Sequence, residues 1–443
     1  MDKSVKWMWL SLKLSAASPV FSDLYQKFGD IDSIFNADYD AYIEAGVGEK
    51  YAELLSDKSA SYATEVLSYC SRYNVQTLAY DDKAYPMSLR SLKNPPILLY
   101  VWGKMPDLNR ELCISVVGTR KMSEYGMKQA YKISYEMASA GAVIVSGMAL
   151  GIDGIAACGA ITAGGKTVAV LGCGIDVVYP KEHATLEKII AHNGAIITEY
   201  PPSTKPQGTN FPIRNRIISG LSQGTLVVDA DLHSGAMITA KEAILQGKDI
   251  YAVPGNIDGR NTSGTNSLIR DGAQAVLCGR DIIQNYTYIY RDTLNTSALS
   301  KAEKKSDIDL RAVRDMEVSV RYYVDKKEND SLEGEISKMG QAKAKGETKK
   351  TAPEAKAKQP EVAKAQPSEV KEEPHVSDKS QKVVDLLNEK QRAIFEEIPL
   401  DKPITVDGLM KLGFSMGEIM SSLTILEIKG LISSLPGALY IRK

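Results

Sequence analysis

Residues 112–277 predict a doubly wound α/β domain, because short β-branched runs alternate with segments of helical period along this stretch. The strand-like runs are 112–117, 142–146, 167–171, 195–198, 224–228, 249–253 and 273–277. The helical segments between them are 124–140, 152–163, 183–192, 213–221, 237–246 and 266–271. Nearly continuous apolar strands separated by amphipathic helices indicate a parallel sheet with helices on both faces.

The first 76 residues are expected to form a helical domain. An apolar stripe over 5–14 indicates one helix, and Pro19 begins a second that runs to Phe28. The segment Ala45-Gly46-Val47-Gly48 resembles the Gly-x-Gly turn of a SAM/helix-hairpin-helix-like domain, whose backbone N–H groups hold a DNA phosphate. A plain turn between two helices explains these glycines at least equally well.

The α/β domain is expected to span 77–294 and to begin with a connector. Residues 77–80 are strand-like, 81–86 are typical of a turn, and 97–103 are apolar enough to form a second strand. The connector therefore leads from the helical domain into the alternating strands and helices.

The last third of the chain divides into a charged segment and a small domain. Lys, Glu, Ala, Pro and Gln dominate 295–380. Such a composition buries too little apolar surface to offset its ordering entropy, so we expect a disordered linker. Helical periodicity returns over 381–443, where three helices and a terminal hairpin predict a winged-helix-like domain. Its third helix, 418–427, carries little positive charge, which favours a protein contact or a purely structural role over duplex reading.

Composition limits the classes of function. The 443 residues carry a formal net charge of −1, so there is no overall basic field and any anion site must be local. The five cysteines form no C-x-x-C pair, which indicates reduced thiols, and the four histidines are scattered, which gives a metal site little support. With no secretory signal and no apolar run of membrane-spanning length, we expect a cytoplasmic protein.

Glycines and small hydroxyls follow the strand-like runs. In a doubly wound sheet, ligands bind outside the carboxyl ends of the strands, so the residues there form the candidate site. These candidates are Gly118, Thr119, Arg120, Ser146, Gly147, Ser234 and Gly235. Accessible backbone N–H groups together with local positive charge are what a phosphate-binding rim needs. At Ser234 an ordinary helix cap is the alternative.

The stretch 211–220 adds the strongest local signal. Pro212 suits the first turn of a helix, whose free N–H groups and dipole favour an anion. Arg214 and Arg216 bring forked donors that match phosphate, with Asn215 between them, and Phe211 offers a ring for base stacking. The alternative is a helix start whose arginines pair with carboxylates and whose Phe211 lies in the core.

Enzymatic signatures are incomplete. Gly172-Cys173-Gly174 follows a strand, but Val177 stands where a dinucleotide loop needs its third glycine, and no G-x-x-x-x-G-K-[ST] occurs. Ser146-Gly147 lacks the G-x-S-x-G of a nucleophile elbow.

Three carboxylates, Asp153, Glu199 and Asp229, stand at or near strand ends. Two of them have the chemistry for acid–base work, but with arginines close at hand we favour orientation of those arginines. We therefore expect a non-catalytic protein with no cofactor and no metal.

A series of short motifs runs through the whole α/β domain. In order they are 117–120, 146–153, 170–176 with Tyr179-Pro180, 199–201, 211–216, 234–235 with 238–240, 253–255, 264–266, 268–269 and 272–273. In this order and spacing the sequence resembles the DNA-processing protein A (DprA/Smf) family. Asp81 with Tyr85-Pro86, and Pro95-Pro96 with Leu98 and Gly103, are similar to that family's connector, and the C-terminal module is similar to its winged-helix-like domain.

The resemblance implies an extended Rossmann-like domain that binds single-stranded DNA. It also implies a homodimer formed through that domain, and a role in natural transformation that protects incoming DNA and loads the RecA recombinase. By motif, Arg120 would hold phosphate, and Phe211, Arg214 and Arg216 would line the pocket. The family often has a histidine near Ala157, where Cys158 follows here, so any role of that histidine is in doubt.

Two other functions stay open. A nucleotide-processing enzyme of the nucleoside-monophosphate hydrolase type has similar glycine-rich strand ends, but Pro254-Gly255-Asn256 breaks its P-G-G-x-G-T signature. Duplex reading by the C-terminal domain is opposed by its few basic residues. Turnover of free mononucleotides would distinguish the enzyme from a single-strand binder.

Overall fold

The computed structural model describes residues 1–304 and, near the C-terminus, 389–399, 404–412, 414, 419, 422–423, 426, 431–435 and 439–442. The chain divides into two compact units, Met1–Thr351 and Ala352–Lys443, which are described separately. Within the described ranges, no helix is long and apolar enough to cross a membrane.

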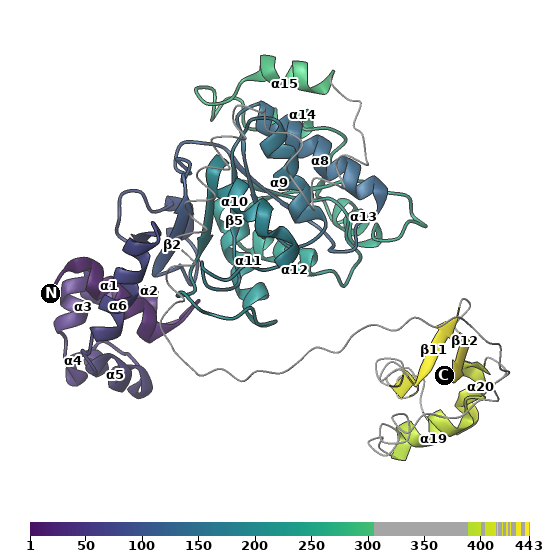
Figure 1. Ribbon diagram of the computed structural model, residues 1–443, viewed down its shortest axis with the longest axis horizontal. Coiled ribbons are helices and arrows are strands. Elements are labelled where there is room, and N and C mark those ends of the chain that lie inside the picture. The colour runs from purple at the N-terminus through teal and green to yellow at the C-terminus, as the bar shows by residue number, and fades with distance from the viewer. Residues whose placement is uncertain are drawn as a thin grey trace, which may run out of the picture. The chain divides into compact units, whose positions relative to one another are not determined.

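The first unit is built on a nine-stranded sheet (Figure 1). Its strands are β1 (Gln76–Ala79), β2 (Leu98–Gly103), β3 (Cys113–Val117), β4 (Val143–Ser146), β5 (Thr167–Val170), β6 (Ala195–Thr198), β7 (Gly224–Val227), β8 (Asp249–Ala252) and β9 (Gln274–Ala275). Their order is β1-β2-β6-β5-β4-β3-β7-β8-β9. Strands β3 to β9 are mutually parallel, whereas β2 runs antiparallel to β6 and β1 antiparallel to β2. The predicted doubly wound parallel sheet is confirmed.

The helices of this sheet are α7 (Met87–Arg90), α8 (Glu124–Ser139), α9 (Ile152–Thr162), α10 (Ala184–Asn193), α11 (Asn210–Leu221), α12 (Gly235–Leu245), α13 (Ser263–Arg270) and α14 (Arg280–Ile283). Alternation along each strand divides the core into two clusters. Ile114 and Val116 of β3 pack with residues of α8, α9 and α10, while Cys113 and Val117 pack with residues of α11 and α12. Because successive strand residues point to opposite faces, both faces of the sheet are covered by helices.

The strand order reverses at β3, which has β4 on one side and β7 on the other. The chain runs from β3 outward to β6, returns to β7 beside β3, and continues to β9. In open α/β sheets the crevice at the carboxyl edge near such a reversal is the usual place for a ligand.

The N-terminal region is helical, as expected. It comprises α1 (Lys3–Leu14), α2 (Phe21–Phe28), α3 (Ile31–Asn36), α4 (Tyr39–Glu44), α5 (Glu49–Ser56) and α6 (Ser61–Arg72), drawn in purple in Figure 1. Trp7 and Trp9 of α1 are buried at its centre. The α4–α5 connection turns at Gly46, whose φ of +82° is a backbone conformation that glycine adopts most easily.

The helical region is tied to the sheet by polar contacts as well as packing. The hydroxyl of Tyr100 on β2 lies 3.1 Å from the sulfur of Met8 on α1. The hydroxyl of Tyr69 on α6 donates to Asp176 in the loop after β5. These contacts fix α1 and α6 beside the strands that they touch.

The predicted linker begins with ordered structure. Helix α15 (Thr296–Glu303) starts at Asn295, whose backbone N–H donates to the carbonyl of Ala140 at the end of α8. Leu299 of this helix is buried. The rest of the predicted linker, from residue 305, lies outside the described residues.

The second unit contains α19 (Glu389–Glu397), α20 (Val406–Leu409), the short 3-10 helix Met410–Leu412, and the strands β10 (Ile404–Thr405), β11 (Ile432–Leu435) and β12 (Leu439–Arg442). The three strands form an antiparallel sheet in the order β10-β12-β11, so the expected hairpin pairs as β11 and β12. Of the predicted helix 418–427, only residues 419, 422, 423 and 426 are described. The winged-helix-like assignment stays a prediction.

Candidate nucleic-acid interface

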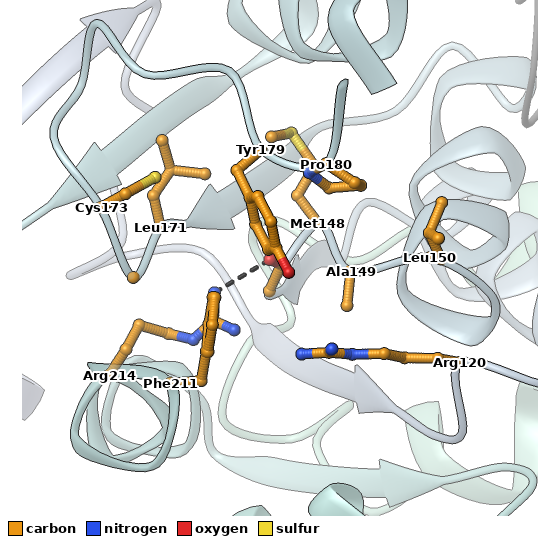
Figure 2. Close-up of a pocket in the computed structure, with 12 residues that line it drawn as sticks. Arg120, Met148, Ala149, Leu150, Leu171, Cys173, Tyr179, Pro180, Phe211 and Arg214 are labelled. Carbon is orange, nitrogen blue, oxygen red and sulfur yellow. Dashed lines mark hydrogen bonds between the residues drawn. The ribbon is translucent and has the colours of Figure 1, made fainter. Parts of the chain in front are cut away.

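A small pocket lies at the carboxyl edge of β3, β4 and β5, where α11 begins (Figure 2). Its lining comprises Arg120, Gly147, Met148, Ala149, Leu150, Leu171, Gly172, Cys173, Tyr179, Pro180, Phe211 and Arg214. The cavity measures about 40 Å³. That volume suits one small group such as a phosphate and not a whole nucleotide, because a cavity that encloses a single benzene ring measures roughly 150 Å³.

Arg120 provides the exposed cation of the pocket. It follows β3, and its guanidinium carbon lies 5.4 Å from the ring centre of Phe211. Figure 2 shows its side chain extending across the pocket toward that ring. Arg120 is exposed and forms no ion pair within the residues that the structure describes, so its forked donors face solvent above an aromatic surface. This combination suits an anionic backbone next to a stacked base.

Two aromatic rings meet at this edge. Phe211 stacks on Tyr179 with ring centres 5.4 Å apart and planes 29° apart. Gly172 lies beneath Phe211, and a Cβ at that glycine would come within 2.8 Å of the ring. The glycine of the broken dinucleotide loop is therefore required for packing of the aromatic ring.

Arg214 builds the pocket wall instead of projecting from it. Only 4% of the residue is exposed, and its Nη1 donates to the backbone carbonyls of Gly147 and Val170. A Cβ at Gly147 would lie 2.7 Å from the guanidinium, so the two residues fit only because position 147 is glycine. Burial lowers the pKa of Arg214. The guanidinium remains charged at neutral pH because its ordinary pKa is above 12.

Asp153 supports the same wall from the start of α9. Its Oδ2 accepts hydrogen bonds from the backbone N–H groups of Gly147, at 3.0 Å, and Ala149, at 3.4 Å. Burial raises the pKa of Asp153, and the nearby charge of Arg214 opposes that rise. The carboxylate thus holds the loop after β4 and balances Arg214, as expected for an orienting group.

Arg216 is not brought to the pocket. It is 8% exposed, and its Nη2 pairs with Oε2 of Glu199 at 2.5 Å. The backbone N–H of Ala17, from the N-terminal helical region, also donates to that oxygen, at 3.4 Å. Burial raises the pKa of Glu199, and the charge of Arg216 opposes the rise. The buried pair connects α11, the end of β6 and the helical region.

The other predicted site residues either support the pocket from behind or lie away from it. Ser146 donates its hydroxyl to the carbonyl of Val116, and the amide oxygen of Asn215 accepts from Nε of Arg214. Gly118 lies against Ile152, where a Cβ would be 2.5 Å from the isoleucine side chain. These are supporting positions behind the pocket.

Thr119 and the pair Ser234-Gly235 lie toward the other side of the strand reversal. The N–H of Thr119 donates to the carbonyl of Asp229, after β7. Ser234 caps α12 by accepting from the N–H of Ala236 at 3.3 Å, and neither Ser234 nor Gly235 lines the pocket.

Several lining residues were absent from the predicted site, above all Tyr179, Met148 and Leu150. Tyr179 had one signal, an aromatic residue before Pro180 in a motif-rich loop. Met148 has a φ of +54°, an uncommon backbone conformation for a side chain of its size, and such outliers concentrate at functional sites.

Groups of three or more His, Cys, Asp or Glu side chains placed to hold a metal ion are absent from the part of the chain that the structure describes. The arrangement instead combines glycine-lined strand ends, an exposed guanidinium and stacked aromatic rings. These groups have the chemistry to recognise an anion attached to an aromatic group. The fold defines a doubly wound α/β protein whose candidate site lies at the carboxyl edge of the sheet.

Comparison with known proteins gives the family. The model of the DNA recombination-mediator protein A family matches residues 76–287. DNA processing protein DprA of Bacillus subtilis is 39% identical over 219 residues, which cover 49% of this chain and 74% of that protein. The chain belongs to the DNA processing protein A (DprA/Smf) family.

Two solved structures are similar to this chain in sequence, and the first also agrees in fold over part of the chain. The structure of DNA processing protein A from Streptococcus pneumoniae is 30% identical, covers 62% of this chain and 97% of its own, and superposes with a TM-score of 0.56. A structure of the Helicobacter pylori protein, described by its single-stranded DNA binding mode, is 32% identical, covers 49% and 99%, and has a TM-score of 0.44.

Proposed function

We propose that this chain is a non-catalytic single-stranded DNA-binding protein that protects incoming DNA and loads the RecA recombinase in natural transformation. The observation that carries the proposal is the exposed Arg120 guanidinium beside the Phe211 ring. A phosphate at Arg120 with a base against the rings satisfies both groups at once. Membership of a DNA-processing family supports this ligand.

The size of the pocket favours a strand that passes over the rim. A cavity of about 40 Å³ accepts one group of a polymer, while neighbouring nucleotides run along the edge of the sheet. A hydrolase would enclose its whole nucleotide and leave a carboxylate free for proton transfer. Here no carboxylate is among the residues that line the pocket, and the nearby Asp153 and Glu199 hold backbone N–H groups and Arg216, respectively. Asp229 is buried outside the pocket. This arrangement supports binding over hydrolysis.

We assign DNA binding to residues 77–294, with the helical domain 1–76 packed against it and 381–443 as a separate small domain. The homodimer is assigned to the outer face of α12. Ile238, Ile244 and Leu245 on that helix are exposed although they are large and apolar. A second copy of the chain that covers this face removes apolar surface from water, which is the usual basis of a homodimer.

The first test is fluorescence anisotropy of a labelled oligothymidine with the wild type and Arg120→Ala, at two salt concentrations. We expect Arg120→Ala to weaken binding by about tenfold, the value of one charged contact. Arg110→Ala is the matched control. Arg110 is also exposed, but it precedes β3 and so lies at the opposite edge of the sheet. It should bind as the wild type does.

Other results reject the proposal. Equal binding by the wild type and Arg120→Ala removes Arg120 from the site. No binding by the folded wild type, together with turnover of free mononucleotides, establishes the hydrolase instead.

Recombinase loading and dimer formation are tested separately. RecA assembly on single strands that are already covered by single-strand-binding protein should be faster with the wild type than without it. Sedimentation should show that Ile244→Glu/Leu245→Glu lowers the molar mass. An unchanged mass would reject α12 as the dimer face.

A further inference from the structure

Asp229 lies at the strand reversal, two residues after β7 and outside the pocket, and only 1% of it is exposed. Its backbone carbonyl accepts from the N–H of Thr119 at 2.6 Å. Its Oδ2 accepts from the N–H of Ser123 at 2.7 Å. One aspartate therefore holds the chain on both sides of Arg120.

Asn261 adds a third attachment to the same loop. Its side-chain amide donates to the carbonyl of Lys121 at 2.8 Å and lies 3.4 Å from Oδ2 of Asp229. Lys121 in turn donates its N–H to the hydroxyl of Thr119 at 3.2 Å. The loop 119–123 is thus fastened at 119, 121 and 123.

Two glycines let the supporting groups approach this closely. A Cβ at Gly126, in the first turn of α8, would lie 2.6 Å from the Asp229 carboxylate. Gly151 has a φ of +81°, and a Cβ there would lie 2.5 Å from the carbonyl of Thr119 and 2.8 Å from that of Arg120. The backbone under Arg120 is enclosed from both sides, although its side chain is exposed.

The remaining oxygen of Asp229, Oδ1, is buried and has no hydrogen-bond partner among the described residues. Burial raises the pKa of this carboxyl group, while the N–H of Ser123 opposes the rise. Burying an incompletely paired carboxylate lowers the stability of the fold. Such a cost is typical of residues that serve a functional site. The other oxygen, Oδ2, contacts Ser123 of the Arg120 loop and Asn261, which is attached to that loop.

We infer that Asp229 is a positioning residue for DNA binding: together with Asn261 it fixes the loop 119–123 so that the Arg120 guanidinium is held over the Phe211 ring. The inference rests on the proposed function. A long arginine side chain that starts from a fixed backbone loses less conformational entropy when it meets a phosphate, which increases affinity without a new contact.

The test is a double-mutant cycle in oligothymidine binding, measured by anisotropy on the full chain. Asp229→Ala should weaken binding about fivefold in the wild-type background and by less than about twofold in Arg120→Ala, since its effect passes through Arg120. Asp229→Asn keeps an oxygen that accepts from Ser123 and should recover most of the affinity. A general loss of structure would weaken both backgrounds alike.

Asn261→Gly is the second variant, in case Asp229→Ala does not fold. Asn261 has a φ of +67°, which glycine adopts without strain, so only the side-chain attachment is lost. We expect a loss of about twofold that disappears in Arg120→Ala. Asp281→Ala is the matched control, because Asp281 also accepts from two backbone N–H groups, those of Leu277 and Cys278, in a loop away from the rim.

Each outcome of these binding measurements supports or overturns the inference. Equal losses in the two backgrounds, or binding by Asp229→Ala and Asn261→Gly equal to that of the wild type, overturn the inference and leave the proposed function intact. If the wild type does not bind, or if Arg120→Ala binds as the wild type does, the proposed function fails first and the inference fails with it.

Discussion

Two segments carry arginines near the pocket, the loop 119–123 and the start of α11, and their arginines differ in exposure and pairing. Arg120 projects into solvent from a backbone fastened by Asp229. Arg214 and Arg216 are buried at 4% and 8% exposure and bind backbone carbonyls and Glu199. An exposed cation on a fixed backbone is available to a ligand, whereas a paired and buried cation is part of the scaffold.

The largest effect is expected at Arg216, and it should be an effect on stability. Arg216→Ala leaves Glu199 buried without its partner, which costs about 3–5 kcal/mol of unfolding free energy. Urea unfolding measures the loss. Glu199→Gln/Arg216→Met, which removes both charges, should recover much of it. If Arg216→Ala were as stable as the wild type, Arg216 would not be a structural residue and would resemble Arg120 instead.

Arg214 should come next. Arg214→Ala removes the donor for the carbonyls of Gly147 and Val170 and leaves Asp153 without its nearest cation, so we expect a loss of about 2–3 kcal/mol in unfolding free energy. Thermal and urea unfolding would show it. Arg120→Ala, measured in parallel, should change stability by less than about 0.5 kcal/mol because its side chain is exposed. A larger loss of stability in Arg120→Ala than in Arg214→Ala would contradict the assignment of Arg214 to the scaffold and Arg120 to the ligand.

Substitution of Phe211 tests whether its ring contacts the ligand or only packs in the core. Phe211→Ala should weaken oligothymidine binding by about 1–3 kcal/mol if a base stacks on it. Phe211→Tyr keeps the ring and should bind nearly as the wild type does. Anisotropy of both variants, with unfolding curves to confirm that they are folded, makes the comparison. Unchanged affinity of a folded Phe211→Ala would leave the ring a packing residue.

A smaller effect should appear in the salt dependence of binding. If Arg120 neutralises one phosphate, Arg120→Ala should lower the slope of log affinity against log salt by about 0.7 for a single strand. Titrations at four or more salt concentrations measure the slope. Arg110→Ala should keep the wild-type slope, and a slope that Arg120→Ala leaves unchanged would mean that Arg120 meets no phosphate.

The smallest effect is expected in the pH dependence of stability, through the buried carboxyl group of Asp153. Because the pKa of Asp153 is raised by burial, the folded state binds its proton more tightly than the unfolded state does. This group's contribution to stability is full below its ordinary pKa of 3.8 and is lost as pH rises through the higher folded value. Asp153→Asn removes that loss, so its stability relative to the wild type should increase with pH across this window. A constant difference between the two unfolding curves would contradict the raised pKa.

Local sequence patterns are enough to predict the strands, the helices and the edge of the sheet at which the pocket lies. Strand periodicity, helical periodicity and glycines at strand ends are local properties, so the predicted runs coincide with β3 to β9 and α8 to α13 within a few residues. The position of Arg120 also followed from the sequence, because a residue just beyond a parallel strand must lie at the carboxyl edge.

Which arginine is available to a ligand depends on packing between distant parts of the chain. Arg214 and Arg216 are two residues apart and project from the helix roughly 200° from each other, so helix geometry alone indicates that they face different ways but not which of them faces a ligand. Their partners, Val170 and Glu199, are distant in sequence, and so are Tyr179, which stacks on Phe211, and Asp229, which holds the Arg120 loop. Burial and pairing are properties of the packed chain, and they divide similar side chains into those that hold the protein together and those that face a ligand.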